Sequence, residues 1–294
     1  VVDINKIHLA LEQKGLNVEY LEEVDPTTLQ PSQQPKNLTL LAAAIRCGDT
    51  RLIDHTFLMT RKPIIAIDGP AGAGKSTVTK AFANKLGLLY LDTGAMYRAV
   101  AWLIQKNHLN PKNEQGVQKL LEGLELQLEL QQFKGQAKVI INGNDVTESI
   151  RSPKVTSIVS SVASQSAVRK ALTKQQKKLG ASGGIVAEGR DIGTTVFPNA
   201  ELKIFLTAST NERAKRRVLD LKEKGFPHPD LNEVELAIIQ RDEMDYNREI
   251  SPLKKAKDAI ELITDGMNIE EVVTKIEQLF RKKIPEEVWP TLSH

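Results

Sequence analysis

The stretch IIAIDGPAGAGKS, residues 64–76, decides the fold expected for this chain. Its opening run, Ile64–Ile67, is apolar at every position, which is typical of a strand buried on both faces in a parallel sheet. A glycine-rich turn follows, and a segment with the pattern of a helix begins near Lys75. The order of strand, turn and helix predicts an α/β fold built on a parallel sheet.

The turn matches the phosphate-binding pattern G-x-x-x-x-G-K-[ST]. Its glycines allow successive N–H groups to point at phosphate oxygens, and the N-terminus of the following helix adds a partial positive charge. Lys75 can reach the β- and γ-phosphates, and the Ser76 hydroxyl can ligate Mg²⁺. The predicted triphosphate site comprises Gly69, Pro70, Ala71, Gly72, Ala73, Gly74, Lys75, Ser76 and Thr77.

Strand-like and helix-like segments alternate beyond this motif. Further strands are predicted at 88–91, 185–187, 202–206 and 260–264, and helices at 75–86, 96–106, 156–179, 211–224, 231–247 and 269–282. This alternation predicts a parallel sheet covered by helices on both faces. The segments Leu124–Leu130 and Ala137–Ile141 alternate apolar and polar residues around Lys134-Gly135, which predicts an antiparallel hairpin.

The composition is that of an ordinary globular protein, with 40% hydrophobic and 26% charged residues. The longest apolar runs are far shorter than the ~18 residues of a membrane span, and no N-terminal signal sequence is visible. The single cysteine, Cys47, excludes an internal disulfide, is expected to be a small core residue, and fits a cytoplasmic location. A net charge of +3 with 4% aromatic residues gives no case for nucleic acid.

A triphosphate site alone leaves kinases, GTPases and ATP-driven machines open. The guanine-reading pattern N-K-x-D is absent, because Asn84-Lys85-Leu86-Gly87 lacks the Asp, and the switch pattern D-x-x-G is absent too. The predicted strand Ile185–Ala187 is followed by Glu188-Gly189-Arg190-Asp191 instead of the acidic pair typical of a motor. These features favour a kinase of a small molecule.

Several arginines are placed to bind an anionic acceptor. Arginine pairs bidentately with phosphate and stays charged. Arg98, Arg190, Arg241 and Arg248 are predicted near strand ends or loops, where ligands bind in open α/β sheets. Arg213, Arg216 and Arg217 have helical i, i+3, i+4 spacing, so we expect them to share one helix face.

From about Pro63 onward, four ordered blocks resemble bacterial cytidylate (CMP/dCMP) kinases. These blocks are residues 67–77 (IDGPAGAGKST), 91–98 (LDTGAMYR), 188–198 (EGRDIGTTVFP) and 241–248 (RDEMDYNR). The resemblance implies a P-loop nucleoside-monophosphate-kinase fold, with a parallel sheet flanked by helices. It also implies a hairpin-containing insert that binds the monophosphate at about 92–180, and a helical lid at about 207–250.

The resemblance further implies transfer of the γ-phosphoryl group of ATP to CMP or dCMP, with Mg²⁺ as cofactor. Asp191 and Ser160 would accept from the cytosine amine, an acceptor pair that reading cytosine requires. Arg169 would donate toward the O2/N3 side of the base, while Arg241 and Asp245 would contact the sugar. The implied CMP-binding set is Thr93, Tyr97, Arg98, Ser160, Arg169, Arg190, Asp191, Arg241, Asp245 and Arg248.

The implied catalytic set is Lys75, Arg98, Arg190 and Arg248, and Arg213 and Arg217 would belong to the lid that closes over ATP. Glu188 and Thr93 depart from the family, whose members often have Asp and Ser at these positions. The kinase section is expected to be monomeric.

The first 59 residues have a different signature. The segments 20–29 (YLEEVDPTTL) and 40–55 (LLAAAIRCGDTRLIDH) resemble the end of pantoate–β-alanine ligases. Some bacteria fuse this ligase ahead of cytidylate kinase, and the start at Val1 fits a chain truncated inside such a fusion. We therefore expect a ligase remnant at 1–59 and a kinase at 60–294. The parent ligase would be dimeric, and the remnant is too short to act as that enzyme.

Two other hypotheses remain from the residues. One is a P-loop kinase of another small acceptor such as UMP, AMP or shikimate, which the acceptor groups Asp191 and Ser160 disfavour. The other is a non-catalytic nucleotide-binding scaffold, which the presence of Lys75 and of the arginines disfavours.

Overall fold

The computed structural model describes residues 3–31, 37–129, 138–223, 225 and 229–289. Contacts divide these residues into a first unit, 1–62 together with Ile284–Trp289, and a second unit, Pro63–Lys283. The sequence-based division into a section ending at residue 59 and a kinase section running to residue 294 stays a prediction about domains.

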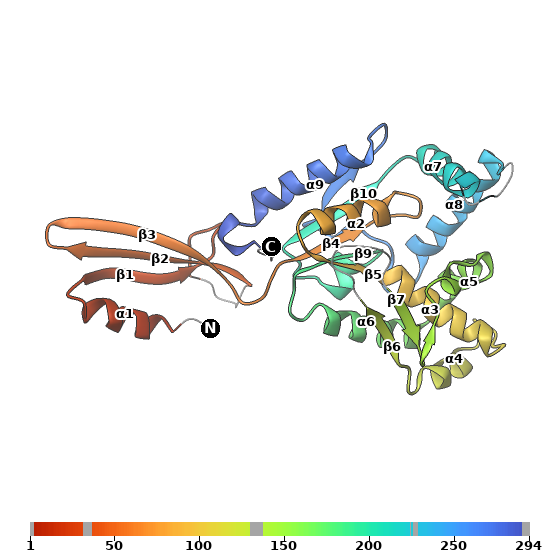
Figure 1. Cartoon of the computed structure of the whole chain (residues 1–294), viewed down its shortest axis with the longest axis horizontal. Helices are drawn as coiled ribbons and strands as arrows, with labels where there is room; N and C mark the ends of the chain where they lie inside the picture. Colours follow the sequence, from red (N-terminus) through yellow and green to blue (C-terminus); the bar gives the residue numbers. More distant parts are fainter. Residues whose placement is uncertain (1–2, 32–36, 130–137, 224, 226–228, 290–294) are drawn as a thin grey trace. The chain divides into compact units, whose positions relative to one another are not determined.

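The first unit is a helix and an antiparallel three-stranded sheet (red to orange in Figure 1). Its elements are α1 (Ile4–Glu12), β1 (Asn17–Val24), β2 (Leu38–Cys47) and β3 (Thr50–Met59), with the strand order β1-β2-β3. Cys47 is exposed, so the expectation of a core cysteine is wrong. The reason is local, because Cys47 ends β2 at a tight hairpin turn and pairs with Thr50.

The second unit is built on a parallel five-stranded sheet with the order β11-β10-β4-β9-β5, which confirms the predicted fold class (Figure 1). Its strands are β4 (Ile64–Asp68), β5 (Leu89–Asp92), β9 (Ile185–Gly189), β10 (Leu202–Thr207) and β11 (Ile260–Ile263). Every residue of β4 is buried, as its apolar run predicts. The register sets Asp68 opposite Gly189 of β9 and Phe205 of β10, so the ends of these three strands meet.

Helices flank this sheet (Figure 1). The helices of this unit are α2 (Lys75–Lys85), α3 (Thr93–Lys106), α4 (Glu114–Leu121), α5 (Pro153–Ala163), α6 (Ser166–Leu179), α7 (Thr210–Glu223), α8 (Leu231–Asn247) and α9 (Ile269–Lys283). Of these, α2, α3 and α9 pack directly on strands of the sheet, whereas α7 packs on α8 and α4 on α6. None of the helices in the described residues is long and apolar enough to span a membrane.

Three helix predictions need correction. The helix expected at 156–179 is two helices, because the chain becomes extended at Gln165, with ψ 131°. The helix expected from Met96 begins at Thr93, since the Asp92 side chain accepts from the N–H of Ala95 and caps it earlier. The helix α4 was not predicted, although Asn113 caps it in the same way.

The predicted hairpin forms β6 (Leu126–Glu129) and β7 (Lys138–Ile141), which pair antiparallel. A short strand, β8 (Asn144–Asp145), pairs antiparallel with β7 and completes a three-stranded sheet. Residues 130–137, including the expected turn at Lys134-Gly135, lie outside the described residues. The buried side chains Val139 and Ile141 place β7 in the same apolar core as α3.

Candidate functional site

The phosphate loop connects β4 to α2 and has the conformation that its glycines permit. Gly69 has φ 151°, and a Cβ there would lie 1.9 Å from the carbonyl oxygen of Leu206, so only glycine fits. Gly72 and Gly74 have φ 76° and 81°, which lie in the left-handed region. Gly74 directly precedes α2, so the helix N-terminus opens onto the loop.

Lys75 lies inside this loop. Its Nζ donates to the carbonyl oxygen of Pro70 at 2.7 Å, and the side chain is buried. Burial lowers the pKa of Lys75 well below its usual value, and the nearby charge of Arg190 lowers it further. The carboxylates of Glu188 and Asp68 act in the opposite direction. An anion bound in the loop would balance the positive charges of Lys75 and Arg190.

Ser76 faces a buried carboxylate at the end of β9. Its Oγ donates to Oε1 of Glu188 at 2.6 Å, and the hydroxyl of Tyr90 donates to the same oxygen at 2.8 Å. The second oxygen, Oε2, is buried and has no hydrogen-bond partner among the described residues. Burial, together with the charge of Asp92, raises the pKa of Glu188.

This oxygen set fits Mg²⁺. The ion prefers hard oxygen ligands and is bound in kinases through few protein groups plus substrate phosphates. A hydroxyl at the head of α2 and an unsatisfied carboxylate oxygen provide such groups, so Ser76 and Glu188 could hold the ion. The described residues contain no group of three or more His, Cys, Asp or Glu that would form a separate metal site.

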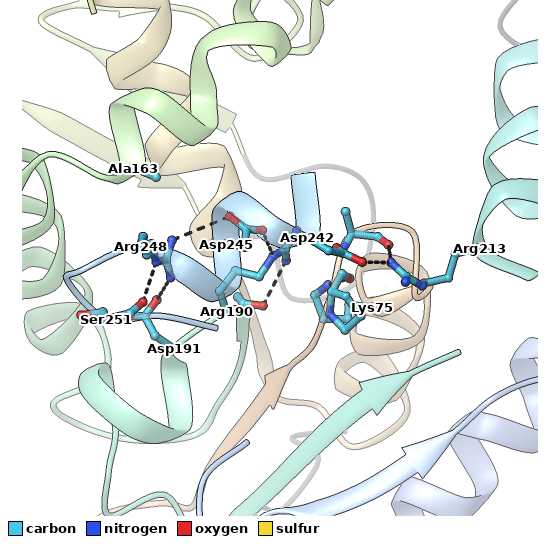
Figure 2. A network of polar contacts seen from close by, with 12 residues as sticks. Lys75, Ala163, Arg190, Asp191, Arg213, Asp242, Asp245, Arg248 and Ser251 are labelled. Atoms are coloured by element: carbon cyan, nitrogen blue, oxygen red, sulfur yellow. Dashed lines mark hydrogen bonds and ion pairs between the residues drawn. The ribbon is translucent and has the colours of Figure 1, made fainter. Parts of the chain in front are cut away.

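Asp191 follows β9 and lies between two buried arginines. Arg169 of α6 donates to its Oδ2, and Nη2 of Arg248 lies 3.5 Å from its Oδ1 (Figure 2). Arg169 also donates to the carbonyl oxygen of Ala163 at 3.0 Å, and its guanidinium carbon lies 5.5 Å from the centre of the Tyr97 ring. The structure therefore brings together four residues of the predicted CMP-binding set, namely Tyr97, Arg169, Asp191 and Arg248.

One face of α8 carries the buried Asp242 and Asp245, and Arg248 lies just beyond the helix end (Figure 2). Nε of Arg190 donates to Oδ2 of Asp245 at 2.8 Å. Arg241 of the same helix has a buried Nε without a partner among the described residues. Burial and the charge of Arg190 lower the pKa of Arg241 to about 10. A phosphate group would satisfy the cations gathered here.

Arg98 and Thr93 lie at the start of α3. Nη2 of Arg98 donates to Oδ2 of Asp92 at 2.8 Å, while its buried Nε has no partner among the described residues. The Thr93 hydroxyl donates to the carbonyl oxygen of Glu188 at 2.7 Å, so in this structure it ties α3 to β9. Ser160 lies half-buried on α5.

The three arginines of α7 lie at helical i, i+3, i+4 positions, and each has its own partners. Arg213 is buried and donates to the carbonyl oxygen of Ala71 at 2.9 Å and to Asp242 at 2.6 Å. Arg216 donates to Glu212 and to Thr264, whereas the exposed Arg217 pairs with Asp220. Glu212 and Asp220 belong to α7 itself, whereas Ala71, Asp242 and Thr264 come from other parts of the chain.

Sequence reasoning missed three carboxylates of the site. Glu188 was noted only as a departure from the family, and Asp68 only as part of the quoted stretch 64–76. Asp242 stands three residues before Asp245 on α8, and this helical spacing was a usable signal.

Comparisons with known proteins agree with this geometry. A family model described as "Cytidylate kinase" matches residues 65–282, which is more than half of the chain. A "Bifunctional pantoate ligase/cytidylate kinase" of Prochlorococcus marinus (strain MIT 9303) is 63% identical over 290 residues, covering 99% of this chain and 59% of that protein. A protein of the same name from Synechococcus sp. (strain CC9605) is 56% identical, covering 98% and 60%.

The chain thus spans somewhat more than half the length of these relatives. Among solved structures, a shikimate kinase from Bacteroides thetaiotaomicron is 15% identical, with a TM-score of 0.38, over 74% of this chain and 98% of that one. The family match over residues 65–282 covers the phosphate loop and all the acidic and basic residues just described, and the chain belongs to the cytidylate kinase family.

Proposed function

We propose that this chain transfers the γ-phosphoryl group of ATP to CMP or dCMP, giving ADP and CDP or dCDP. The observation that carries the proposal is the meeting of two sites at one edge of the sheet. Helix α8 links them, because Asp242 accepts from the N–H of Ala71 in the phosphate loop at 3.4 Å and Asp245 accepts from Nε of Arg190 at 2.8 Å. Asp191, which would read the base, directly follows Arg190.

The loop would hold the donor. Its N–H groups and the N-terminus of α2 would bind the phosphates, and Lys75 would exchange the carbonyl of Pro70 for the β- and γ-phosphate oxygens. Mg²⁺, held by Ser76 and Glu188, would neutralise phosphate charge when bound. Arg213 already contacts the loop carbonyl of Ala71 and would face the donor from the lid.

The arginines would hold the acceptor. Arg98, Arg190 and Arg248 would clamp the monophosphate, so that one of its oxygens points at the γ-phosphorus in line with the leaving oxygen of ADP. The new oxygen–phosphorus bond would form as the bond to ADP breaks, with charge stabilised by Lys75 and the guanidinium groups. No side chain is required as a nucleophile.

Base selection would come from Asp191 and Ser160 as acceptors for the cytosine amine, with Arg169 donating to the base. Uracil has a carbonyl where cytosine has the amine, so a carboxylate there would repel it. A kinase of UMP is the alternative, and the experiment below decides between them.

The N-terminal unit supports a second, weaker proposal. Because the relatives are named as pantoate ligases as well as cytidylate kinases, we infer that a longer parent protein carries ligase activity. This chain should show none, since its section that resembles the ligase is too short to act as that enzyme.

The test is ADP production from ATP and Mg²⁺ with CMP, dCMP, UMP or AMP as acceptor. Turnover with CMP and dCMP alone, reduced at least about tenfold in Asp191→Ala, would support the cytosine assignment. Turnover with UMP equal to that with CMP would overturn it and leave a kinase of broader range. Absence of turnover with every acceptor would favour a nucleotide-binding scaffold.

A further inference from the structure

Asp68 is the last residue of β4 and stands directly before the phosphate loop. Its side chain is nearly fully buried, at 5% exposed. Oδ1 accepts from the N–H of Ile192 at 2.8 Å, and Oδ2 accepts from the N–H of Gly193 at 2.7 Å. Both oxygens of one carboxylate therefore hold the two residues that follow Asp191.

These two N–H groups open a short π-helical turn, Ile192–Val196. The first N–H groups of a helical turn have no partner within it, and the residue before the turn normally caps them with its own side chain. That residue is Asp191, an aspartate of the type that caps well, yet its side chain makes no capping bond. Asp68, from a different strand, takes its place.

Because Asp68 caps the turn, the Asp191 carboxylate is available to bind other groups. It lies between Arg169 and Arg248, two residues of the predicted CMP-binding set. The carbonyl oxygen of Asp191 meanwhile accepts from the N–H of Thr195 at 2.8 Å, so the backbone is held from both sides. We propose that Asp68 is a positioning residue, which caps the turn after β9 in place of Asp191 and thereby aims the Asp191 carboxylate at the base of the acceptor.

This inference rests on the proposed function for its effect on substrates, but the capping itself does not. The neighbourhood leaves little room for a substitute. A Cβ at Gly193 would lie 3.4 Å from Oδ2 of Asp68 and 3.1 Å from the side chain of Lys203. The turn Ile192–Val196 thus passes close to the Asp68 carboxylate, and the residue nearest to it is Gly193, which has no side chain.

The substitution Asp68→Asn tests the proposal with little change of volume. The amide keeps one acceptor and sets an NH₂ group against a backbone N–H, so one of the two bonds is lost. Asp191 can then rotate back to cap its own turn. We expect KM for CMP to rise about tenfold and the preference for CMP over UMP to fall by a similar factor, while KM for ATP changes less than about threefold.

Asp25→Asn is the matched control. Asp25 is a buried carboxylate of the first unit that also accepts from two consecutive backbone N–H groups, those of Thr27 at 2.8 Å and Thr28 at 2.9 Å. We expect KM for CMP, KM for ATP and the base preference to stay unchanged in this variant. Equal rises of KM for ATP and CMP in Asp68→Asn, or an unchanged KM for CMP in the folded variant, would overturn the proposal.

Amide hydrogen exchange tests the capping without relying on turnover or on the variant. In the wild-type chain the N–H groups of Ile192 and Gly193 should be protected, and in Asp68→Asn they should exchange at least about tenfold faster. Fast exchange of both amides in the wild type would overturn the proposal, even if Asp68→Asn fails to fold. A wild type with protected amides but no turnover of CMP would instead refute the proposed function.

Discussion

At the scale of single residues, arginines of this site form ion pairs with aspartates. Arg190, Arg213 and Arg169 each face an aspartate, namely Asp245, Asp242 and Asp191. A buried charge without a partner is costly, so these carboxylates stabilise the guanidinium groups and hold them in place.

The pair of Arg213 and Asp242 should matter much more for stability than that of Arg217 and Asp220. The first pair has side chains 7% and 12% exposed, the second 44% and 39%. We expect Asp242→Asn to lower the free energy of unfolding by about 2 kcal/mol, because it weakens a buried pair. Asp220→Asn should lower it by less than about 0.5 kcal/mol. Urea unfolding of both variants gives the comparison, and equal effects would contradict it.

The titration of Asp68 should be visible in stability. Burial raises its pKa to about 6, although the N–H groups of Gly193 and Ile192 lower it. Between pH 6 and about 4 the folded chain therefore holds a proton that the unfolded chain releases, so this group stabilises the fold increasingly as the pH falls toward 4.

Asn does not titrate, so Asp68→Asn provides the reference. From pH 7.5 to pH 5 the wild type should gain about 1 kcal/mol of unfolding free energy relative to Asp68→Asn. Denaturant titrations of the two proteins at both pH values measure this difference. A constant difference would mean that the folded-state pKa of Asp68 is unshifted.

At the scale of elements, the loop between β4 and α2 and the helix α8 form the site. The loop curls because Gly69, Gly72 and Gly74 adopt conformations that other residues resist. The helix α8 carries Asp242 and Asp245 on one face, with Arg248 beyond its end. One rigid element thus presents counter-charges to the loop, to Arg190 and to the turn after β9.

Gly69→Ala should be far more damaging than Gly123→Ala. The added methyl group at position 69 would lie 1.9 Å from the carbonyl oxygen of Leu206, whereas at position 123 nothing lies within 4 Å. Gly123 has φ 77°, so its replacement costs about 1 kcal/mol of backbone strain, while the clash at Gly69 should cost more than about 3 kcal/mol. Thermal unfolding and ATP binding measure both. Retained ATP binding in Gly69→Ala would contradict the role of this close approach.

At the scale of the whole molecule, the described residues form two units, and every predicted site residue belongs to Pro63–Lys283. The family match has nearly the same bounds, residues 65–282. None of the predicted site residues lies among the described residues of the first unit.

A shortened chain of residues 63–283 should therefore keep its turnover. We expect its kcat/KM for CMP to stay within about threefold of that of the full chain, since each unit has its own contacts. Steady-state assays of the two chains compare them, with circular dichroism to establish that the shorter one folds. A folded but inactive shorter chain would show that the first unit supports the site.

The phosphate-binding motif and the parallel sheet could be predicted because short contiguous sequence patterns indicate both. The apolar side chains of a run such as Ile64–Ile67 are removed from water only when the strand is buried on both faces. The glycines of the loop permit a backbone conformation that few other residues adopt. The break at Gln165 and the helix α4 were missed. The free energy of a helix cap is similar in size to the differences in helix propensity among residues, so a local pattern does not show which of the two prevails.

The sequence by itself determined that this chain has a phosphate loop on a parallel sheet and which family it belongs to, since these depend on short contiguous patterns. Only the tertiary structure decided the partners of the charged side chains. Asp68 meets Gly193, and Arg213 meets Ala71 and Asp242, across long stretches of sequence. Such pairings follow from where strand ends and helix faces converge, and a buried charge accepts whichever opposite charge or N–H group the fold brings within reach.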